Sequence, residues 1–137
     1  MIKLADFAGL WMLERRIDDR LGQPGRFSGV ARFTRDGDGL RLTEEGRLDL
    51  GTASFKATRV YLWQADGDGI AVRFEDGRDF HRFTPKGAAN STHWCDPDQY
   101  DVTYDFARMS KTATVWTSEW RVTGPRKDYV MRSTYRR

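Results

Sequence analysis

The sequence predicts an all-β protein: an antiparallel up-and-down (meander) β-barrel of eight or nine strands, in a single domain over residues 1–137. Three observations predict this fold. Apolar and polar residues alternate with period two along almost the whole chain, which is the pattern of half-buried strands. Short Gly/Asp segments separate the alternating runs, as hairpin turns require. No segment has a helical period long enough to connect parallel strands, so the strands follow one another as a meander.

Each alternating run predicts one strand, and each break between runs predicts a turn. The first run, for example, places Trp11, Leu13, Arg15 and Ile17 on one face. We expect residues 85–99 to form a loop, because no clear apolar alternation runs through them. The predicted turns include GQPG at 22–25, DGDG at 36–39 and 66–69, and Asp76-Gly77. The predicted strands are 11–17, 27–34, 40–50, 55–63, 70–74, 78–83, 100–106, 116–122 and 129–135.

A meander of this length has one apolar face that must be covered. Closing the sheet into a barrel buries that face and also removes the exposed strand edges. A barrel of about eight strands can hold a small ligand. The two DGDG turns lack the further oxygen ligands that a calcium loop needs at set spacings, so we interpret them as hairpin turns only.

Composition limits the class of protein. A chain of 137 residues can bury a single core without disulfides. The net charge of +3 comes from 23 basic and 20 acidic residues that are largely interleaved, which disfavours a nucleic-acid partner. One cysteine excludes an intrachain disulfide and suits the cytoplasm. The N-terminus has no apolar core of a signal peptide, and no apolar run approaches the roughly 20 residues that cross a bilayer, so we expect no membrane partner.

The N-terminal segment carries a short motif, FAGLWML at 7–13, of the form F-x-G-x-W-x-L. At the start of an all-β chain this motif resembles the opening of the calycins, which include lipocalins, intracellular fatty-acid-binding proteins and nitrobindin-like barrels. The resemblance implies a lipocalin-like barrel in which Trp11 plugs the closed end beneath a basic residue of the last strand. Arg132 and Arg136 are the candidates for that residue.

Nearly the full chain also looks like an uncharacterised bacterial family with a lipocalin-like barrel and no established function. The segments that carry this second resemblance are DGRDFHRF at 76–83, HWCDPDQYDVTYDF at 93–106 and GPRKDYVMRSTYRR at 124–137.

The chain departs from the better-known calycins at their ligand sites. Arg132 and Tyr135 are three residues apart and so fall on opposite faces of a strand, whereas the fatty-acid-binding proteins use an inward Arg-x-Tyr pair. No histidine follows His93, which disfavours the haem site of nitrobindin-like barrels. Neither site can be transferred to this chain, and we expect no cofactor.

Three charged residues break the apolar face. Arg15, Glu44 and Arg59 occupy positions of the interior parity, where a charge is costly unless it is paired or hydrated. They predict either an internal network with one positive charge in excess, suited to a carboxylate, phosphate or polar head group, or a closed salt-bridge cluster. Aromatic walls would come from Tyr61, Tyr104 and Trp120.

The two histidines are further candidates. His81, in DFHRF, is either a hydrogen-bonded core or rim residue or a polar contact for a ligand. His93 and Trp94 are expected to fold over the mouth of the barrel from the 85–99 loop. His93 and Cys95 do not complete a zinc site, because no second pair of ligands follows them, and Asp96-Pro97-Asp98 is typical of a turn. We expect no metal.

The favoured function is therefore non-catalytic binding of a small, partly apolar molecule with an anionic or polar end. Two alternatives stay open: an isomerase or hydrolase that uses Glu44, His81 or Tyr104 as acid–base groups, and a protein- or nucleic-acid-binding module that uses the basic C-terminal strand. The sequence leaves the ligand and the oligomeric state open. The predicted ligand-binding residues are Arg15, Glu44, Arg59, Tyr61, His81, His93, Tyr104 and Trp120.

Overall fold

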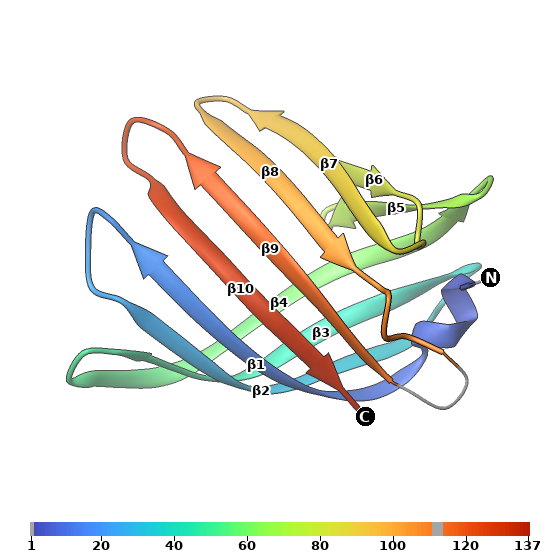
Figure 1. The fold of residues 1–137 in the computed structure, drawn as a ribbon, viewed down its shortest axis with the longest axis horizontal. Helices are drawn as coiled ribbons and strands as arrows, with labels where there is room; N and C mark the ends of the chain where they lie inside the picture. Colours follow the sequence, from blue (N-terminus) through green and yellow to red (C-terminus); the bar gives the residue numbers. More distant parts are fainter. Residues whose placement is uncertain (1, 111–113) are drawn as a thin grey trace.

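The computed structural model describes residues 2–110 and 114–137. Ten strands form one antiparallel sheet in the order β6-β5-β4-β3-β2-β1-β10-β9-β8-β7, and Figure 1 shows this sheet curled into a nearly closed barrel. The all-β meander is confirmed, but with ten strands in place of eight or nine. The elements are η1 (Leu4–Phe7), β1 (Gly9–Asp19), β2 (Gly25–Asp36), β3 (Gly39–Leu50), β4 (Ala53–Asp66), β5 (Gly69–Phe74), β6 (Asp79–Phe83), β7 (Ala88–Cys95), β8 (Asp98–Asp105), β9 (Val115–Thr123) and β10 (Asp128–Arg136).

The extra strand is β7, which lies in the segment predicted as a loop. It pairs with β8 along its whole length, from Ala88–Asp105 to Cys95–Asp98. Its inward positions, Ala89, Ser91 and His93, are small or polar, so the strand has no apolar alternation that the sequence could display. The rings of β8 opposite them, such as Tyr104 across from Ala89, occupy the interior instead. Asp96 and Pro97 form the turn, as predicted.

The barrel has two different ends because neighbouring strands alternate in direction. One end carries the β1–β2, β3–β4, β5–β6, β7–β8 and β9–β10 turns, and the other carries η1 and the remaining turns (Figure 1). Rings at the second end, such as Phe7 and Trp11, are completely buried. At the first end Tyr61, Phe74 and Tyr100 are only half-buried. We call the end with the half-buried rings, which carries the β1–β2 turn, the open end. We call the end with the buried rings, which carries η1, the closed end.

The seam of the barrel lies between β6 and β7. β1 and β10 pair with each other and close the meander at its termini, whereas β6 and β7 share no backbone ladder among the described residues. Side chains bridge the seam instead: the rings of Phe80 and His93 are 5.5 Å apart, and His81 hydrogen bonds to Tyr104. In the described part of the chain no helix has the length and apolar character needed to cross a membrane.

A bulge at the start of β6 changes which side chains face inward. Val72 pairs with His81 and Arg73 pairs with Asp79, so Phe80 has no partner across the ladder. Such an extra residue locally disturbs the alternation of a strand. As a result Phe80 and His81, which are neighbours in sequence, are both buried. Strict alternation would have placed one of them outside.

The closed end is plugged by Trp11, which is fully buried. Its indole Nε1 donates to the carbonyl oxygen of Phe7 at 2.8 Å. Arg137 lies over the indole, with its guanidinium carbon 4.0 Å from the ring centroid, and donates to the carbonyl oxygens of Asp6 and Ala8.

The sequence predicted Arg132 or Arg136 as the basic residue over Trp11. This prediction is wrong, because Arg137 occupies that place. Arg132 lies on the outer face, where it pairs with Asp18 and Glu119. Arg136 is exposed because it follows the inward Tyr135. Arg137 lies beyond the end of β10, so it is free of the strand's alternation and can turn back over the indole.

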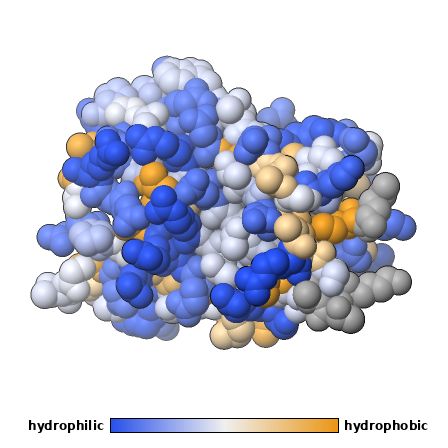
Figure 2. All heavy atoms as spheres, in the orientation of Figure 1, coloured by the Kyte–Doolittle hydropathy of each residue, from blue (hydrophilic) through white to orange (hydrophobic). Residues whose placement is uncertain are grey.

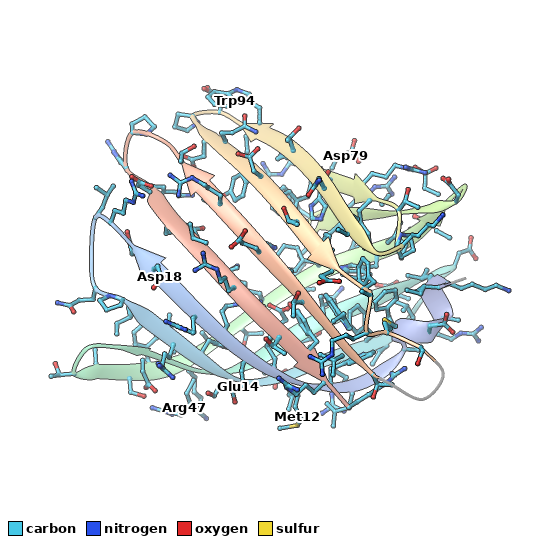
Figure 3. The ribbon with its side chains drawn as sticks, in the orientation of Figure 1. Met12, Glu14, Asp18, Arg47, Asp79 and Trp94 are labelled. Carbon is cyan, nitrogen blue, oxygen red and sulfur yellow. The ribbon has the colours of Figure 1, made fainter. Side chains whose placement is uncertain are left out.

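The outer face is largely charged. Figure 2 shows hydrophilic residues over much of the visible surface, with smaller apolar patches on the side where the N-terminus lies in Figure 1 and on the opposite side. Glu14, Asp18 and Arg47 are labelled in Figure 3 and point away from the barrel interior. Among the described residues, the interior face of the barrel carries the main cluster of buried apolar side chains.

Candidate binding site at the open end of the barrel

Deep inside the barrel, Arg15 and Glu44 form a closed cluster with two residues of β10. Arg15 donates to Glu44 Oε1 at 2.8 Å and to Ser133 Oγ at 2.7 Å. The hydroxyl of Tyr135 donates to Glu44 Oε2 at 2.5 Å. Arg15 is 5 % exposed and Glu44 2 % exposed. The charges therefore satisfy one another, and the cluster is closed to ligands as it stands.

The electrostatics of this cluster follow from its burial. Burial acts to lower the pKa of Arg15, but the attraction of Glu44 and Tyr135 outweighs it and raises the pKa above its ordinary value. Burial and the Glu44 carboxylate raise the pKa of Tyr135. Arg15 therefore stays charged and Tyr135 stays neutral, which keeps Tyr135 a donor to Glu44. The sequence reasoning missed Ser133 and Tyr135, although both share the inward parity of Met131.

His81 and Tyr104 form a second buried pair across the seam. Their atoms Nε2 and Oη are 2.8 Å apart. Burial, with a smaller contribution from the charge of His93, lowers the pKa of His81 to about 3, and burial raises the pKa of Tyr104 well above 10. Both side chains are therefore neutral near pH 7. The Nδ1 atom of His81 and the Nε1 atom of Trp116 have no hydrogen-bond partner among the described residues.

A consequence for pH dependence follows from His81. The unfolded chain binds a proton at this histidine near pH 6.5, and the folded protein does so only near pH 3. Between these values the unfolded state binds more protons, so stability falls as the pH falls. We expect a loss of about 1.5 kcal/mol from His81 between pH 6.5 and pH 5. Urea unfolding at pH 6.5 and pH 5 measures this loss of unfolding free energy. The variant His81→Gln keeps a polar side chain but cannot titrate, so it should lack the part of the loss that comes from His81. Equal losses in both proteins would contradict the assignment.

The deep interior has little free volume. One cavity of about 20 Å³ lies among His81, Tyr104, Trp116, Glu44 and their neighbours. Another of about 40 Å³ lies on the open side of the Arg15–Glu44 pair. Each has room for only one or two water molecules. Binding sites for organic ligands are larger, at about 300–1,000 Å³.

The open end is different, and Arg59 lies at its edge. Its Cα is directly opposite that of Glu44 on β3, but Glu44 turns toward Arg15 instead. The guanidinium carbon of Arg59 lies 5.6 Å from the ring centroid of Trp120. No carboxylate of the described residues comes within 4.0 Å of this half-buried guanidinium. Arg59 is therefore the excess positive charge that the sequence predicted.

A groove of about 420 Å³ opens beside Arg59. β4 supplies one wall and the β5–β6 turn supplies the other; β4 pairs with β5 only from Tyr61 onward, and this leaves a corner between them. The inward rings near the groove form a continuous aromatic cluster that also includes Phe80, His93, Tyr100 and Trp120. The residues that line the groove are Arg59, Val60, Tyr61, Phe74, Glu75, Asp76 and Arg78.

The predicted site residues thus divide among three places. Arg15 and Glu44 lie in the closed cluster, and His81 and Tyr104 in the pair across the seam. Arg59, Tyr61, Trp120 and His93 come together at the open end. Phe74, Phe80 and Tyr100 also belong there; sequence reasoning placed them on strands but not in a site.

The expectation that His93 and Trp94 fold over the mouth is wrong. Both lie on β7, where side chains alternate between faces, and so they point in opposite directions. His93 packs inward, 6.1 Å from the ring of Phe74. Trp94 is 59 % exposed and points outward (Figure 3).

No group of three or more histidine, cysteine, aspartate or glutamate side chains is placed to hold a metal within residues 2–110 and 114–137. We predict that the purified protein carries no stoichiometric zinc and that a chelator leaves its melting temperature unchanged, because His93 and Cys95 have no further ligands to complete a site. Elemental analysis is the measurement. One metal per chain that is lost in His93→Ala would overturn this prediction.

Two solved structures share the fold at 14% sequence identity each. The S-type phycobiliprotein lyase CPES from Guillardia theta superposes with a TM-score of 0.67, over 98% of this chain and 89% of that one. A protein of unknown function from the DUF3598 family of Nostoc punctiforme superposes with a TM-score of 0.62, over 100% of this chain and 49% of that one. The chain therefore spans about half of the second protein. Likeness at this identity supports the barrel fold alone.

Sequence comparison identifies the family. No curated protein matches the chain. Residues 7–137 match the model of a family of unknown function, DUF6314, in agreement with the resemblance to an uncharacterised family over nearly the full chain. Because that match extends over almost every residue, the chain belongs to the DUF6314 family.

Proposed function

We propose that the protein binds a small, partly apolar molecule at the open end of its barrel, through an anionic group held by Arg59. The observation that carries the proposal is the state of Arg59: a half-buried guanidinium against Trp120, with no carboxylate partner among the described residues. The hydroxyl of Tyr61 interacts with this guanidinium but brings no negative charge. A charge that is partly removed from water without a counter-charge is costly. A carboxylate or phosphate that enters the groove relieves this cost and gains a charge-assisted hydrogen bond.

The groove, rather than the barrel interior, is the proposed place of binding. The interior cavities of about 20 and 40 Å³ are too small for an organic molecule, whereas three surface hollows of about 420, 500 and 430 Å³ are large enough. The groove of about 420 Å³ is preferred because it joins the half-buried Arg59 to the rings of Tyr61 and Phe74. Arg15 and Glu44 then support the site from below and do not contact the ligand. Tyr61 and Phe74 supply the apolar walls, and Trp120 packs against Tyr61.

The enzymatic alternative has less support. The three acid–base groups named for it, Glu44, His81 and Tyr104, are 2 %, 8 % and 3 % exposed and are already engaged with other side chains. A general acid or base must come within hydrogen-bond reach of its substrate. Non-catalytic binding is the reading that the geometry favours.

The basic C-terminal strand also gives little support for nucleic-acid binding. Arg132 pairs with Asp18 and Glu119, and Lys127 pairs with Asp98. Two of the five basic residues in 124–137 are therefore paired with acidic side chains, which reduces the charge that a phosphate backbone would meet.

We also propose that the chain is related to the calycins. The support is the closed end, where Trp11 lies beneath Arg137 in the manner that the F-x-G-x-W-x-L motif implies.

A thermal-shift screen of carboxylates and phosphates tests the proposed function. At a hundredfold excess over its dissociation constant, a ligand of the folded state is expected to raise stability by about 2.7 kcal/mol. Arg59→Met, which keeps the aliphatic stem and removes the charge, should abolish the shift. Arg47→Met is the matched control, because Arg47 points outward from the neighbouring strand β3 and should leave the shift unchanged (Figure 3). Hits that survive in Arg59→Met would remove Arg59 from the site.

A further inference from the structure

We propose that the ligand is a flat aromatic molecule with a single anionic group. This inference rests on the proposed function and concerns the same groove. Three features support it: the free volume beside Arg59, the rings that line this space, and the charged side chains around it.

The free volume beside Arg59 is unequal on its two sides. Toward β1, β2 and β3 the space is only about 40 Å³, and the Arg15–Glu44 pair lines it together with Phe27 and the aliphatic side chains of Ile17, Leu48 and Ala57. Toward β5 and β6 the lining includes Tyr61 and Phe74, and the space is about 420 Å³. The body of an anion held by Arg59 therefore extends toward Tyr61 and Phe74, because the smaller space on the other side has no room for it.

The rings on that side are held in place before any ligand arrives. Phe74 stacks on Phe80 with centroids 4.6 Å apart and planes 18° apart, and Tyr61 stacks on the same ring at 6.0 Å. Tyr61 also meets Trp120 edge-on at 5.8 Å. The guanidinium carbon of Arg78 lies 5.5 Å from the centroid of Phe74. A pre-positioned wall of this kind favours a planar ring over a flexible chain, by roughly twofold to tenfold in affinity for one additional ring contact.

The charges limit the ligand to one anionic group. Besides Arg59, the groove is lined by two acidic side chains, Glu75 and Asp76, and by Arg78. Glu75 is bound by Arg41 at 2.6 Å and Asp76 by Arg78 at 2.7 Å, so Arg41 and Arg78 are already paired. A second carboxylate on the ligand would meet Glu75 and Asp76 without a free cation to receive it.

The experiment compares three probes by isothermal titration calorimetry: naphthoate, octanoate and a naphthalene dicarboxylate with its two carboxylates at opposite ends. Naphthoate is expected to bind the wild-type protein most tightly. Phe74→Leu should weaken naphthoate by roughly threefold to tenfold and octanoate by distinctly less, because leucine still offers an apolar contact to a flexible chain. Phe55→Leu is the matched control; Phe55 is an exposed ring of β4 that does not line the groove, so this change should affect neither probe. Phe74→Tyr keeps the ring and should bind naphthoate as the wild-type protein does. It therefore still tests the role of the ring if Phe74→Leu fails to fold.

The outcomes separate the two proposals. If octanoate binds as tightly as naphthoate, or if Phe74→Leu weakens both equally, the aromatic ligand class is wrong, and a loss of binding in Arg59→Met would still support the anion site. If the dicarboxylate binds more tightly than naphthoate, the limit to one anion is wrong. If no probe binds the wild-type protein, the proposed function fails, and this inference fails with it.

Discussion

Replacing Trp11 by alanine is expected to lower the free energy of unfolding by about 3–5 kcal/mol, the cost of removing a fully buried large aromatic side chain. Trp11 has no exposed surface and packs edge-on against Trp116, with ring centroids 6.0 Å apart. Its loss leaves a cavity at the closed end and also leaves Arg137 without the ring that it covers. Several partners therefore lose contacts at once, and β1 and β2 cannot collapse into the space without breaking their ladder.

Urea or thermal unfolding measures this effect, and the chain provides a matched control. Trp94→Ala removes the same side chain from β7, where it is 59 % exposed and points away from the barrel (Figure 3). Its cost should stay within about 0.5 kcal/mol. An unfolding midpoint that moves equally little in Trp11→Ala would mean that the indole does not plug the barrel, and the proposed relation to the calycins would lose its main support.

Replacing Glu44 by leucine is expected to destabilise the protein by about 3–5 kcal/mol, because it leaves the Arg15 charge buried without a counterion. The same change removes the acceptor of the Tyr135 hydroxyl. The double variant Arg15→Met/Glu44→Leu removes both charges and should recover much of the stability, since a well-packed apolar pair often matches a buried ion pair. Chemical denaturation of the two single variants, the double variant and the wild type gives the coupling energy between the two residues.

The exposed pair Arg132–Glu119 is the control for this experiment. Its nitrogen and oxygen are 2.8 Å apart, the same distance as in the Arg15–Glu44 pair, but its side chains are 57% and 46% exposed. Glu119→Leu should therefore cost no more than about 1 kcal/mol. If Glu44→Leu costs no more than Glu119→Leu, water reaches the inner cluster, and the separation of the deep interior from the open end would have to be abandoned.

The alternation of the sequence was sufficient to predict which side of most strands faces inward. Trp11, Arg15, Glu44 and Arg59 were all expected on the interior face, and all are found there, because the side-chain period of a strand is fixed by its backbone geometry. The excess of one positive charge among Arg15, Glu44 and Arg59 followed from the same pattern. These properties are local, and a single sequence contains them.

The tertiary structure decided the rest. β7 is a strand because its backbone pairs with that of β8, although its own residues show no alternation of apolar and polar side chains. The bulge at Phe80 turned both Phe80 and His81 inward, and this depends on how β6 meets β5. Glu44 pairs with Arg15 and not with Arg59, although Arg59 lies directly opposite it on β4. On the Arg15 side, Tyr135 also donates a hydrogen bond to Glu44, and Ser133 accepts one from Arg15. Each of these outcomes depends on contacts between strands far apart in the chain, and so does the division of the barrel into a filled interior and a groove beside Arg59.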